Sequence, residues 1–441
     1  MTSEEARKLV RELFLKTLPH LQAGPKMRQM MRLRGNILEI AGDRVPLHEG
    51  RDVRVVVMGK AANEMVSTLA EIMQGVRLRG VVAALEIPRV QVPGFEYFAG
   101  GHPYPSEQSW LAAEAALALL DQRNVTADDL VIFPISGGGS SLMELPLDSS
   151  ISLEDLRQFH EVLVTCGASI QEINTVRKHF SAVKGGRLAE MAWPARQITL
   201  YVSDVPEHLP SLVASGPTMP DESTLSDCQF VFVQYDLLPK LPPSHVSLWK
   251  SYSIAETPKP GDSCFAQSQY YCLLSNWNAL ETLVERAEAQ GIAAEPLIRT
   301  DDWDFRRAAD YLLKSLAGLR REDVGKPVAI ISGGELSCPV TGDGMGGRNQ
   351  AFVLDCVSKI AGQPIVVLSG GTDGIDGNSP AAGAIADGET WARAKALGLD
   401  PEEFQRRSDS YHFFERLGDT IVTGPTGTNV RDLRILLAYS P

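Results

Sequence analysis

The sequence contains few cysteines and no long hydrophobic run. Its six cysteines are scattered, none forms a C-x-x-C pair, and none is spaced with histidines as zinc ligands are. We therefore expect reduced, buried thiols rather than disulfides or a structural zinc. No apolar run approaches the ~18 residues of a membrane-spanning helix, and residues 1–18 lack the basic start and apolar core of a signal peptide. These absences predict a cytoplasmic protein without a membrane partner.

Positive charge is also scarce. The 441 residues include 42 Lys and Arg against 55 Asp and Glu, which gives a formal net charge of −13, and no dense basic stripe occurs. This balance argues against nucleic acid or an anionic membrane as a partner, although a local cluster of cations can still hold a small anionic substrate. The chain also lacks a G-x-x-x-x-G-K-[ST] motif, which excludes a P-loop nucleotide site.

Short apolar runs that end in Gly, Ser or Asp recur along the chain, and a helical pattern usually follows each of them. Continuous apolar runs predict strands that are buried on both faces of a parallel sheet. Alternation with helices, such as the one expected at 109–122, predicts α/β architecture. Ligands bind at the carboxyl ends of strands in such sheets, so these ends are candidate ligand loops. The runs are 53–62, 129–141, 198–208, 270–280, 328–335 and 365–374.

The length predicts two or three domains, and a proline-rich, weakly patterned stretch at 237–262 indicates a boundary. We expect an N-terminal α/β domain over 1–240, a connection over 241–265, and a second α/β domain over 266–441. A Thr2…Glu5 capping box and one apolar face, which includes Phe14, predict an amphipathic helix at the N-terminus.

The stretch SGGGSS at 136–141 follows one of the predicted strands. Glycine-rich turns of this kind present backbone N–H groups to an anion, so we expect a phosphate cradle built by Ser136, Gly137, Gly138, Gly139 and Ser140. The alternative is a tight turn where two strands crowd each other.

Several cations accompany this loop. Lys60 directly follows the predicted strand 53–58 and can bind a phosphate as a point charge, or it is a solvated surface lysine. The segment 173–190 concentrates basic residues, and on a helix Arg177 and Lys184 would fall near one face. A solvated helix face is the alternative. The pair Gly185-Gly186 in this segment predicts a close approach by another group.

The segment GDGMGGRNQ at 342–350 matches G-x-G-x-x-G, the pattern of dinucleotide-binding loops. The preceding residues 335–344 are predicted to form a hairpin, and Asp373 is too distant to be the ribose-binding acid. We therefore expect these glycines to place Arg348 at the start of a helix over 350–360. Its planar guanidinium suits a carboxylate or a phosphate.

The loop GGTDGIDGN at 370–378 carries Asp373 and Asp376. Paired acids in such a turn suit Mg²⁺ or a hydroxyl to be deprotonated, or they simply form the turn. Glycine turns, cations and acids on one α/β chain together fit phosphoryl transfer, which depends on positioning and charge neutralisation.

These motifs carry a family resemblance. The segments ISGGGSSL, EINTVRKHFSAVKGGRLA, SDVP…ASGPT, GGRNQ, SGGTDGIDG and TGPTGTNVRDL lie between about residues 57 and 434, and their order resembles that of the glycerate 2-kinase family with a C-terminal MOFRL domain. The resemblance implies ATP-dependent phosphorylation of D-glycerate at its 2-hydroxyl, which gives 2-phosphoglycerate, with Mg²⁺, in the cytosol. It also implies an N-terminal Rossmann-like domain and an active site in the cleft between the two domains.

Roles follow from this resemblance. Lys60 and Arg348 match the family's active-site lysine and arginine, and they are expected to hold the glycerate carboxylate or the moving phosphoryl group. Asp204 and Asp373 are expected to hold Mg²⁺ or to accept the hydroxyl proton. Lys184 is assigned to nucleotide phosphate together with the glycine loop. The expected substrate-binding residues are Arg177, Asn174, Asp376 and Asn429.

Two other functions remain open. Relatives of this family have been labelled hydroxypyruvate reductases, which would make GDGMGG a cofactor loop for NAD(P)H. A non-catalytic protein that binds glycerate or a nucleotide is the second alternative, because charges common at the family's motif edges are missing at residues 207–209, 345, 351 and 378–380. The expected partners are small molecules, and the protein is a possible homo-oligomer.

Overall fold

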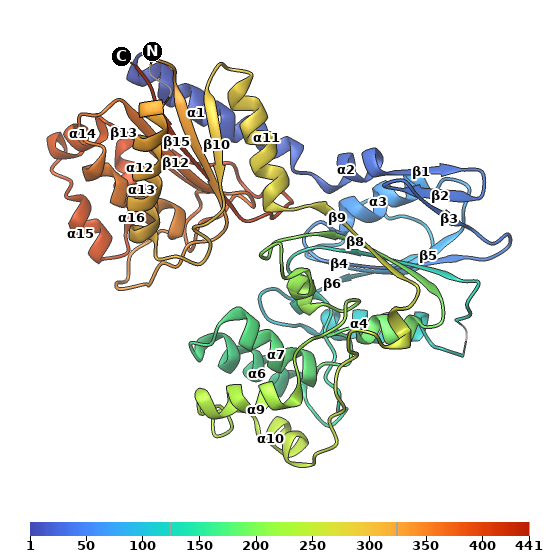
Figure 1. Cartoon of the computed structure of the whole chain (residues 1–441). Helices are drawn as coiled ribbons and strands as arrows, with labels where there is room; N and C mark the ends of the chain where they lie inside the picture. Colours follow the sequence, from blue (N-terminus) through green and yellow to red (C-terminus); the bar gives the residue numbers. More distant parts are fainter. Residues whose placement is uncertain (124, 323–324, 441) are drawn as a thin grey trace. The chain divides into compact units, whose positions relative to one another are not determined.

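The computed structural model describes residues 1–123, 125–322 and 325–440 and divides the chain into two compact units (Figure 1). The central unit comprises Ala23–Leu273. The terminal unit combines Met1–Gln22 with the chain from Leu274 onward. This division differs from the expected boundaries, because residues 1–22 pack with the C-terminal part and residues 241–265 pack within the central unit.

The central unit is built on a six-stranded sheet in the order β6-β5-β4-β7-β8-β9. The neighbouring strands from β6 to β8 pair in parallel, as the apolar runs predict. Helices α3 (Ala62–Ile72), α4 (Glu107–Leu119), α5 (Gly139–Leu142) and α8 (Arg187–Ala192) belong to this unit. The strands are β4 (Val53–Met58), β5 (Leu78–Ala84), β6 (Phe95–Ala99), β7 (Leu130–Ile135), β8 (Arg196–Val202) and β9 (Ser268–Leu274).

Two smaller parts complete the central unit. Helix α2 (Ala23–Met30) precedes a small antiparallel sheet of β1 (Met31–Arg34), β2 (Ile37–Ile40) and β3 (Asp43–Pro46). A separate group of helices, visible in green in Figure 1, consists of α6 (Leu153–Thr165), α7 (Ile170–Phe180), α9 (Leu225–Gln234) and α10 (Pro243–Lys250).

The helix group has an aromatic core. The His245 ring of α10 stacks on Phe159 with centroids 4.3 Å apart, and Phe180 and Trp249 pack around them. Leu237, Leu241 and Leu248 are buried in the same core. The proline-rich stretch is therefore part of a packed domain, because its apolar side chains are buried in one core with those of α6 and α7.

The terminal unit contains a mixed six-stranded sheet in the order β10-β11-β15-β12-β13-β14. Strands β10 and β11 pair in parallel, and the other four pairs are antiparallel. The prediction of a parallel sheet from the runs at 328 and 365 is therefore wrong for this unit. Helices cover both faces, so antiparallel strands are also buried throughout. The strands are β10 (Ala293–Leu297), β11 (Val328–Gly333), β12 (Ile365–Gly371), β13 (Gly383–Asp387), β14 (Thr420–Ile421) and β15 (Asp432–Ala438).

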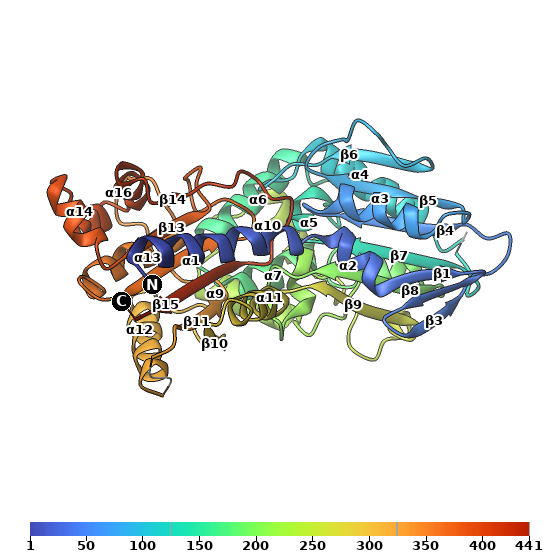
Figure 2. The ribbon, with the colours of Figure 1, turned by 90° about the horizontal axis from the view of Figure 1, so that it is seen from above.

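Helix α1 (Ser3–Thr17) confirms the predicted N-terminal helix and capping box. It contacts β12, β13 and β15 as well as α11 (Asn276–Glu288), which places it on the sheet of the terminal unit (Figures 1 and 2). The Met1 amino group donates to the Ser440 carbonyl at 3.2 Å, so both ends of the described chain lie side by side.

Helices α12 (Phe305–Glu322) and α13 (Arg348–Lys359) pack together over a core that also holds α14 (Thr390–Ala396), α15 (Pro401–Arg406) and α16 (Ser410–Leu417). Three short 3₁₀ turns lie at Leu18–His20, Pro210–Ser215 and Ser263–Phe265. Of the helices described, none combines the length and apolar character needed to cross a membrane.

Candidate active site

Three predicted site segments meet at one edge of the central sheet. Strands β4, β7 and β8 are parallel neighbours, and Lys60, the SGGGSS loop and Asp204 follow their respective carboxyl ends. The Lys60 N–H donates to the Gly137 carbonyl at 2.9 Å, and the Ala61 N–H donates to Ser136 Oγ at 3.0 Å. The structure therefore brings these predicted residues together.

The glycines of this loop are required by the protein's own packing. A Cβ on Gly137 would overlap the Asp204 carboxylate, and one on Gly139 would lie 2.8 Å from the Ala214 Cβ. Gly138 has φ +81°, and a Cβ there would lie 3.3 Å from Lys60 Cγ. The tight-turn interpretation thus accounts for the glycines. Within the described residues, the N–H groups of Gly137 and Gly138 have no acceptor, so the loop can also bind an anion.

His102, which the sequence reading missed, lies beside this loop. Its Nδ1 is 2.9 Å from Ser141 Oγ, which also lies 3.3 Å from the Gly138 carbonyl oxygen. A hydrogen bond between Nδ1 and the Ser141 hydroxyl therefore holds the imidazole beside the glycine loop. Partial burial, together with the charge of Lys60, lowers the pKa of His102. The glycine-rich GGHPYP segment after a strand could have indicated this residue.

Asn174 and Arg177 lie on α7. Ser215 donates to Asn174 Oδ1 at 2.9 Å and lies 2.8 Å from Ser140 Oγ, which links α7 to the glycine loop. Arg177 is half-buried, and its Nε is buried without a hydrogen-bond partner among the described residues. Burial lowers the pKa of Arg177, against the attraction of Glu144.

Lys184 is not on the helix face that the sequence predicted. Helix α7 ends at Phe180, and the next residue, Ser181, has an extended backbone conformation. The Lys184 ammonium pairs with Glu144, and both side chains are buried. Ser181 donates to the other Glu144 oxygen at 2.6 Å, and His160 Nε2 lies 3.3 Å from the oxygen that binds Lys184. Burial acts to raise the pKa of Glu144, but Lys184 and His160 outweigh it and hold it at about 2. This placement favours a structural ion pair.

In the terminal unit, Arg348 is the first residue of α13, as the sequence predicts. Its Nε and Nη2 donate to the two Asp432 oxygens at 2.5 and 3.1 Å, and Nη2 lies 2.9 Å from Glu335. Burial opposes both charges, yet the pair raises the pKa of Arg348 and lowers that of Asp432. Arg348 is nevertheless 36% exposed. The guanidinium is thus oriented by protein groups and still accessible to an anion.

Asp376 caps helix α13. Its oxygens accept from the Asn349 and Gln350 N–H groups at 3.0 and 2.9 Å, and the residue is buried. Burial raises the pKa of Asp376 to about 6, although those hydrogen bonds act against the rise. The carboxylate is therefore occupied by the helix start, which differs from the expected contact with substrate.

The remaining predicted residues of this unit lie in loops. The half-buried Asp373 accepts the Ile375 N–H at 3.1 Å, the contact of a turn-forming aspartate. Asn429 accepts the Arg431 N–H at 2.9 Å. Asp204 and Asp373 belong to different units. Across residues 1–123, 125–322 and 325–440, no group of three or more His, Cys, Asp or Glu side chains is arranged to hold a metal ion.

The hairpin expected at 335–344 is wrong. The described residues there form no strand, because Gly344 N–H donates to the Arg407 carbonyl at 3.0 Å and Met345 N–H donates to Asp409 at 3.0 Å instead of forming a ladder. The glycines at 342–347 pack against residues 407–411 and 376. The G-x-G-x-x-G segment therefore does not form the first turn after β11, which a dinucleotide loop requires.

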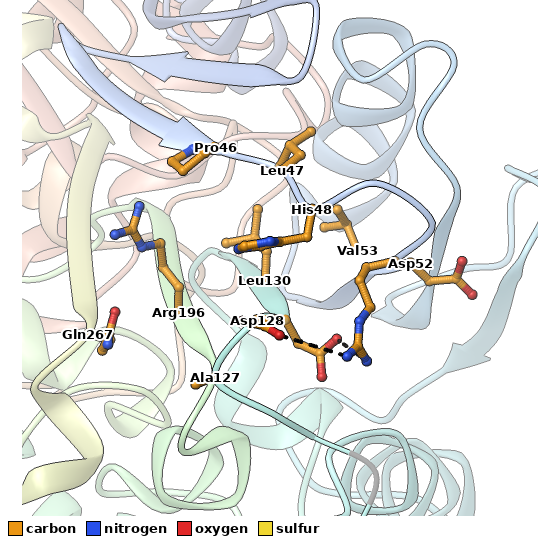
Figure 3. Close-up of a pocket in the computed structure, with 12 residues that line it drawn as sticks. Pro46, Leu47, His48, Asp52, Val53, Ala127, Asp128, Leu130, Arg196 and Gln267 are labelled. Atoms are coloured by element: carbon orange, nitrogen blue, oxygen red, sulfur yellow. Dashed lines mark ion pairs between the residues drawn. The ribbon is translucent and has the colours of Figure 1, made fainter.

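A hollow of about 100 Å³ opens at the other end of the central sheet (Figure 3). Its walls include Val53, Leu130 and Arg196, the first residues of β4, β7 and β8. Arg51 pairs there with Asp128 and Asp129 at 4.0 and 3.6 Å. This hollow lies opposite the loops that carry Lys60, so we do not assign the reaction to it.

The chain is similar to known protein families and to individual proteins. The family described as a domain of unknown function (DUF4147) matches residues 9–250, and the MOFRL family matches residues 328–432. The chain is 37% identical to "D-glycerate 2-kinase" of Thermotoga maritima over 87% of this chain and 90% of that protein. It is also 37% identical to a "putative hydroxypyruvate reductase" of Agrobacterium vitis over 87% of this chain and 86% of that protein.

A solved structure shares the fold. The crystal structure of glycerate kinase from Thermotoga maritima superposes with a TM-score of 0.82 at 33% identity and covers 99% of this chain and 100% of that one. The family matches, the identity over most of the chain and the shared fold agree with one another. The chain therefore belongs to the glycerate kinase family, with an N-terminal DUF4147 domain and a C-terminal MOFRL domain.

Proposed function

We propose that this protein transfers the terminal phosphoryl group of ATP to the 2-hydroxyl of D-glycerate and releases 2-phosphoglycerate. The observation that carries the proposal is Arg348, an accessible guanidinium fixed by Asp432 and Glu335 at the start of a helix. A fork of this kind recognises the carboxylate or phosphate oxygens of such a reaction. The name of the Thermotoga relative, D-glycerate 2-kinase, supports the 2-hydroxyl as the acceptor.

In our proposal, residues from the central unit and from the terminal unit both take part in this reaction. Lys60 and Arg348 hold the glycerate carboxylate and the moving phosphoryl group, and the N–H groups of Gly137 and Gly138 contact phosphate oxygens, flanked by Ser136 and Ser140. Asn174, Arg177 and Asn429 contribute to substrate binding. Lys184 and Asp376 act indirectly, through Glu144 and the start of α13. Fixed donors of this kind stabilise transferring charge without reorganisation.

Asp204 and Asp373 are the proposed carboxylates for Mg²⁺. Mg²⁺ at kinase sites typically takes one or two protein carboxylates with phosphates and water, so no three-residue protein cluster is needed. Asp204 fits this chemistry because its carboxylate lies against Gly137 in the proposed phosphate loop. When bound, the ion would neutralise charge on the phosphates.

The acceptor hydroxyl must lose its proton as the new O–P bond forms. The hydroxyl pKa lies far above neutrality, so a positioned base takes the proton during bond formation rather than before it. Asp204, Asp373 and the His102 imidazole are the candidate acceptors. The lowered pKa of His102 keeps its imidazole neutral and able to accept at neutral pH.

Phosphorus NMR of the product tests the proposal. The protein is incubated with D-glycerate, ATP and Mg²⁺, and 2-phosphoglycerate is the expected product. Phosphorus on the primary hydroxyl would contradict the regiochemistry, and NADH oxidation with hydroxypyruvate would support the reductase alternative. Binding of both ligands without turnover would support the non-catalytic alternative. Lys60→Met should abolish turnover, whereas Lys250→Met, at an exposed lysine of the same unit, should not.

A further inference from the structure

The terminal unit contains a cavity of about 490 Å³ next to Arg348. It lies between the start of α13, the loop that follows β11, and the segment that joins α15 to α16. Its volume falls in the ~300–1,000 Å³ range of pockets for drug-sized ligands. A molecule as small as glycerate would leave most of this space to water.

One side of the cavity is apolar. Phe305, Leu336, Ala351 and Phe404 are almost fully buried beneath its surface. Cys338 belongs to the same wall, and burial raises the pKa of its thiol to about 11, so the side chain stays neutral. Such a wall suits a flat, weakly polar ring system rather than a compact, strongly hydrated acid. The apolar wall residues are Phe305, Leu336, Cys338, Val340, Ala351 and Phe404.

Gln405 is an unpartnered polar group in this wall. Its Oε1 is buried and has no hydrogen-bond partner within the part of the chain that the structure describes. A buried acceptor without a partner costs free energy unless a ligand donor satisfies it. A glutamine amide can bind the N6/N7 edge of adenine with two hydrogen bonds. Its oxygen accepts from the N6 amino group, and its NH₂ group donates to ring nitrogen N7. The corresponding edge of guanine presents two acceptors and leaves Oε1 unsatisfied.

The charged groups at the cavity favour an anionic ligand. The guanidinium of Arg306 lies 4.4 Å from the Phe305 ring centroid and forms no ion pair among the described residues, and Arg348 lines the cavity at the start of α13. The carboxylate of Asp409 is already engaged, because it accepts from Met345 N–H at 3.0 Å and contacts His412 Nδ1 at 2.5 Å. Arg348 is paired with Asp432 and Glu335, so Arg306 supplies the uncompensated positive charge at this cavity of an otherwise acidic protein.

We propose that this cavity binds the adenosine part of the nucleotide, with Gln405 contacting the adenine edge and the phosphate chain directed toward Arg348. The proposal rests on the phosphoryl-transfer function above and assigns nucleotide recognition to the terminal unit. It also assigns the preference for adenine over guanine to one side chain.

Calorimetric titration of the full-length protein with ATP and GTP, each with Mg²⁺, tests this site. Cys338→Phe fills the cavity, and Gln405→Leu removes the amide while keeping a similar volume. Each should raise the Kd for ATP at least tenfold, and the KM for D-glycerate should change less than twofold. Gln405→Leu should also reduce the preference for ATP over GTP. Cys338→Ala, which leaves the cavity open, should lose much less affinity than Cys338→Phe.

Gln290→Leu, at an exposed glutamine of the same unit, is the control and should bind ATP as the parent does. If both cavity variants melt like the parent and bind ATP equally well, the cavity proposal is wrong and the kinase function stands. If the parent binds ATP through this cavity but phosphorylates no glycerate, the cavity proposal stands and the kinase function is wrong. A parent that neither binds ATP nor turns over glycerate overturns both.

Discussion

Arg348 and Asp432 form a bidentate pair in which the aspartate is buried and the arginine is partly exposed to solvent. Asp432 is 1% exposed, whereas Arg348 is 36% exposed. Charge-assisted, two-point contacts of this kind fix the plane of the guanidinium as well as its position. The aspartate therefore holds the arginine, and the exposed side of the arginine is the part that can meet a ligand.

Substitution of Arg348 by lysine removes this fork. An ammonium group can contact one Asp432 oxygen or one ligand oxygen but cannot reproduce two parallel hydrogen bonds. We expect Arg348→Lys to lose about 2–4 kcal/mol of transition-state stabilisation in kcat/KM with the fold retained. Steady-state kinetics and circular dichroism measure the two quantities. Arg321→Lys, at an exposed arginine of α12, is the control, and parent-like kinetics in Arg348→Lys would exclude the anion-binding role.

The sequence predicted Arg348 at a helix start but not the residue that orients it. Asp432 lies 84 positions away, at the start of a strand that the sequence reading did not recognise. His102 was missed for a related reason, because its importance depends on the position of Ser141 and not on a cluster of histidines in the sequence. Lys184 was assigned to a ligand because a charge pattern alone does not reveal a buried partner such as Glu144.

At the scale of elements, the SGGGSS loop combines a conformational and a steric requirement. Gly138 occupies positive φ with modest space around it, whereas Gly137 has ordinary backbone geometry but no room for a Cβ beside Asp204. The two positions therefore separate the effect of strain from the effect of displacing a proposed catalytic side chain.

Gly138→Ala should cost roughly 1–2 kcal/mol of stability through its left-handed conformation. If its N–H also contacts phosphate, the shift in melting temperature produced by ATP and glycerate should shrink as well. Thermal melts with and without these ligands measure both effects. A variant that melts early and still gains the full ligand-induced shift would show that the loop is only structural. Gly167→Ala, at another positive-φ glycine with open space around it, controls for strain alone.

The helix group α6, α7, α9 and α10 should be sensitive to acid. Burial lowers the pKa of His160 and of His245 to about 4, from an ordinary value near 6.5. The folded protein therefore keeps both rings neutral while the unfolded chain takes up protons below pH 6.5. Stability falls as the pH drops through this window, by about 2 kcal/mol per histidine between pH 7 and pH 5.

His245→Phe removes one of these titrations and retains the stacking on Phe159. We expect the variant to lose less stability than the parent as the pH falls from 7 to 5, as measured by thermal melts across that range. It also eliminates His245 Nε2, a buried atom that has no hydrogen-bond partner among the residues the structure describes. His208→Gln, at an exposed histidine of the same unit, should follow the parent. Parallel pH curves for His245→Phe and the parent would contradict the assignment.

Elements with a continuous apolar pattern were predicted well. The runs at 53, 129, 198, 270, 328 and 365 all contain strands, and the N-terminal helix has the expected cap. Strand direction in the terminal unit was not predictable from burial alone, because helices cover both faces of that sheet. The segment 335–344 was wrongly predicted to form a hairpin, since hydrogen bonds at its end and at Met345 are made with residues 407–411 far along the chain.

At the scale of the whole molecule, the first residues of the chain complete the terminal unit. Phe14 of α1 is fully buried, and its ring packs against Gly370 of β12. A Cβ at Gly370 would lie only 2.7 Å from the ring. Arg7 pairs with Asp387 at 3.0 Å and also with Asp419. Helix α1 thus covers strands β12, β13 and β15, which lie more than three hundred residues away in the sequence.

Phe14→Ala should destabilise the terminal unit by about 3–5 kcal/mol, because it leaves a cavity between α1 and the sheet. Hydrogen exchange followed by mass spectrometry should show lost protection in β12, β13 and β15 and unchanged protection in β4 and β7. Lys16→Ala, on the exposed face of the same helix, should leave exchange unchanged. Equal loss of protection in both units would mean that α1 does not belong to the terminal unit alone.

The contact between Met1 and Ser440 allows the chain to be reordered. A short linker can join these ends because the Met1 nitrogen already lies 3.2 Å from the Ser440 carbonyl. A circular permutant that opens between Gln22 and Ala23 then consists of two tandem domains, residues 23–273 followed by 274–441 and 1–22. The terminal unit becomes one uninterrupted polypeptide, and a single cleavage after Leu273 releases it.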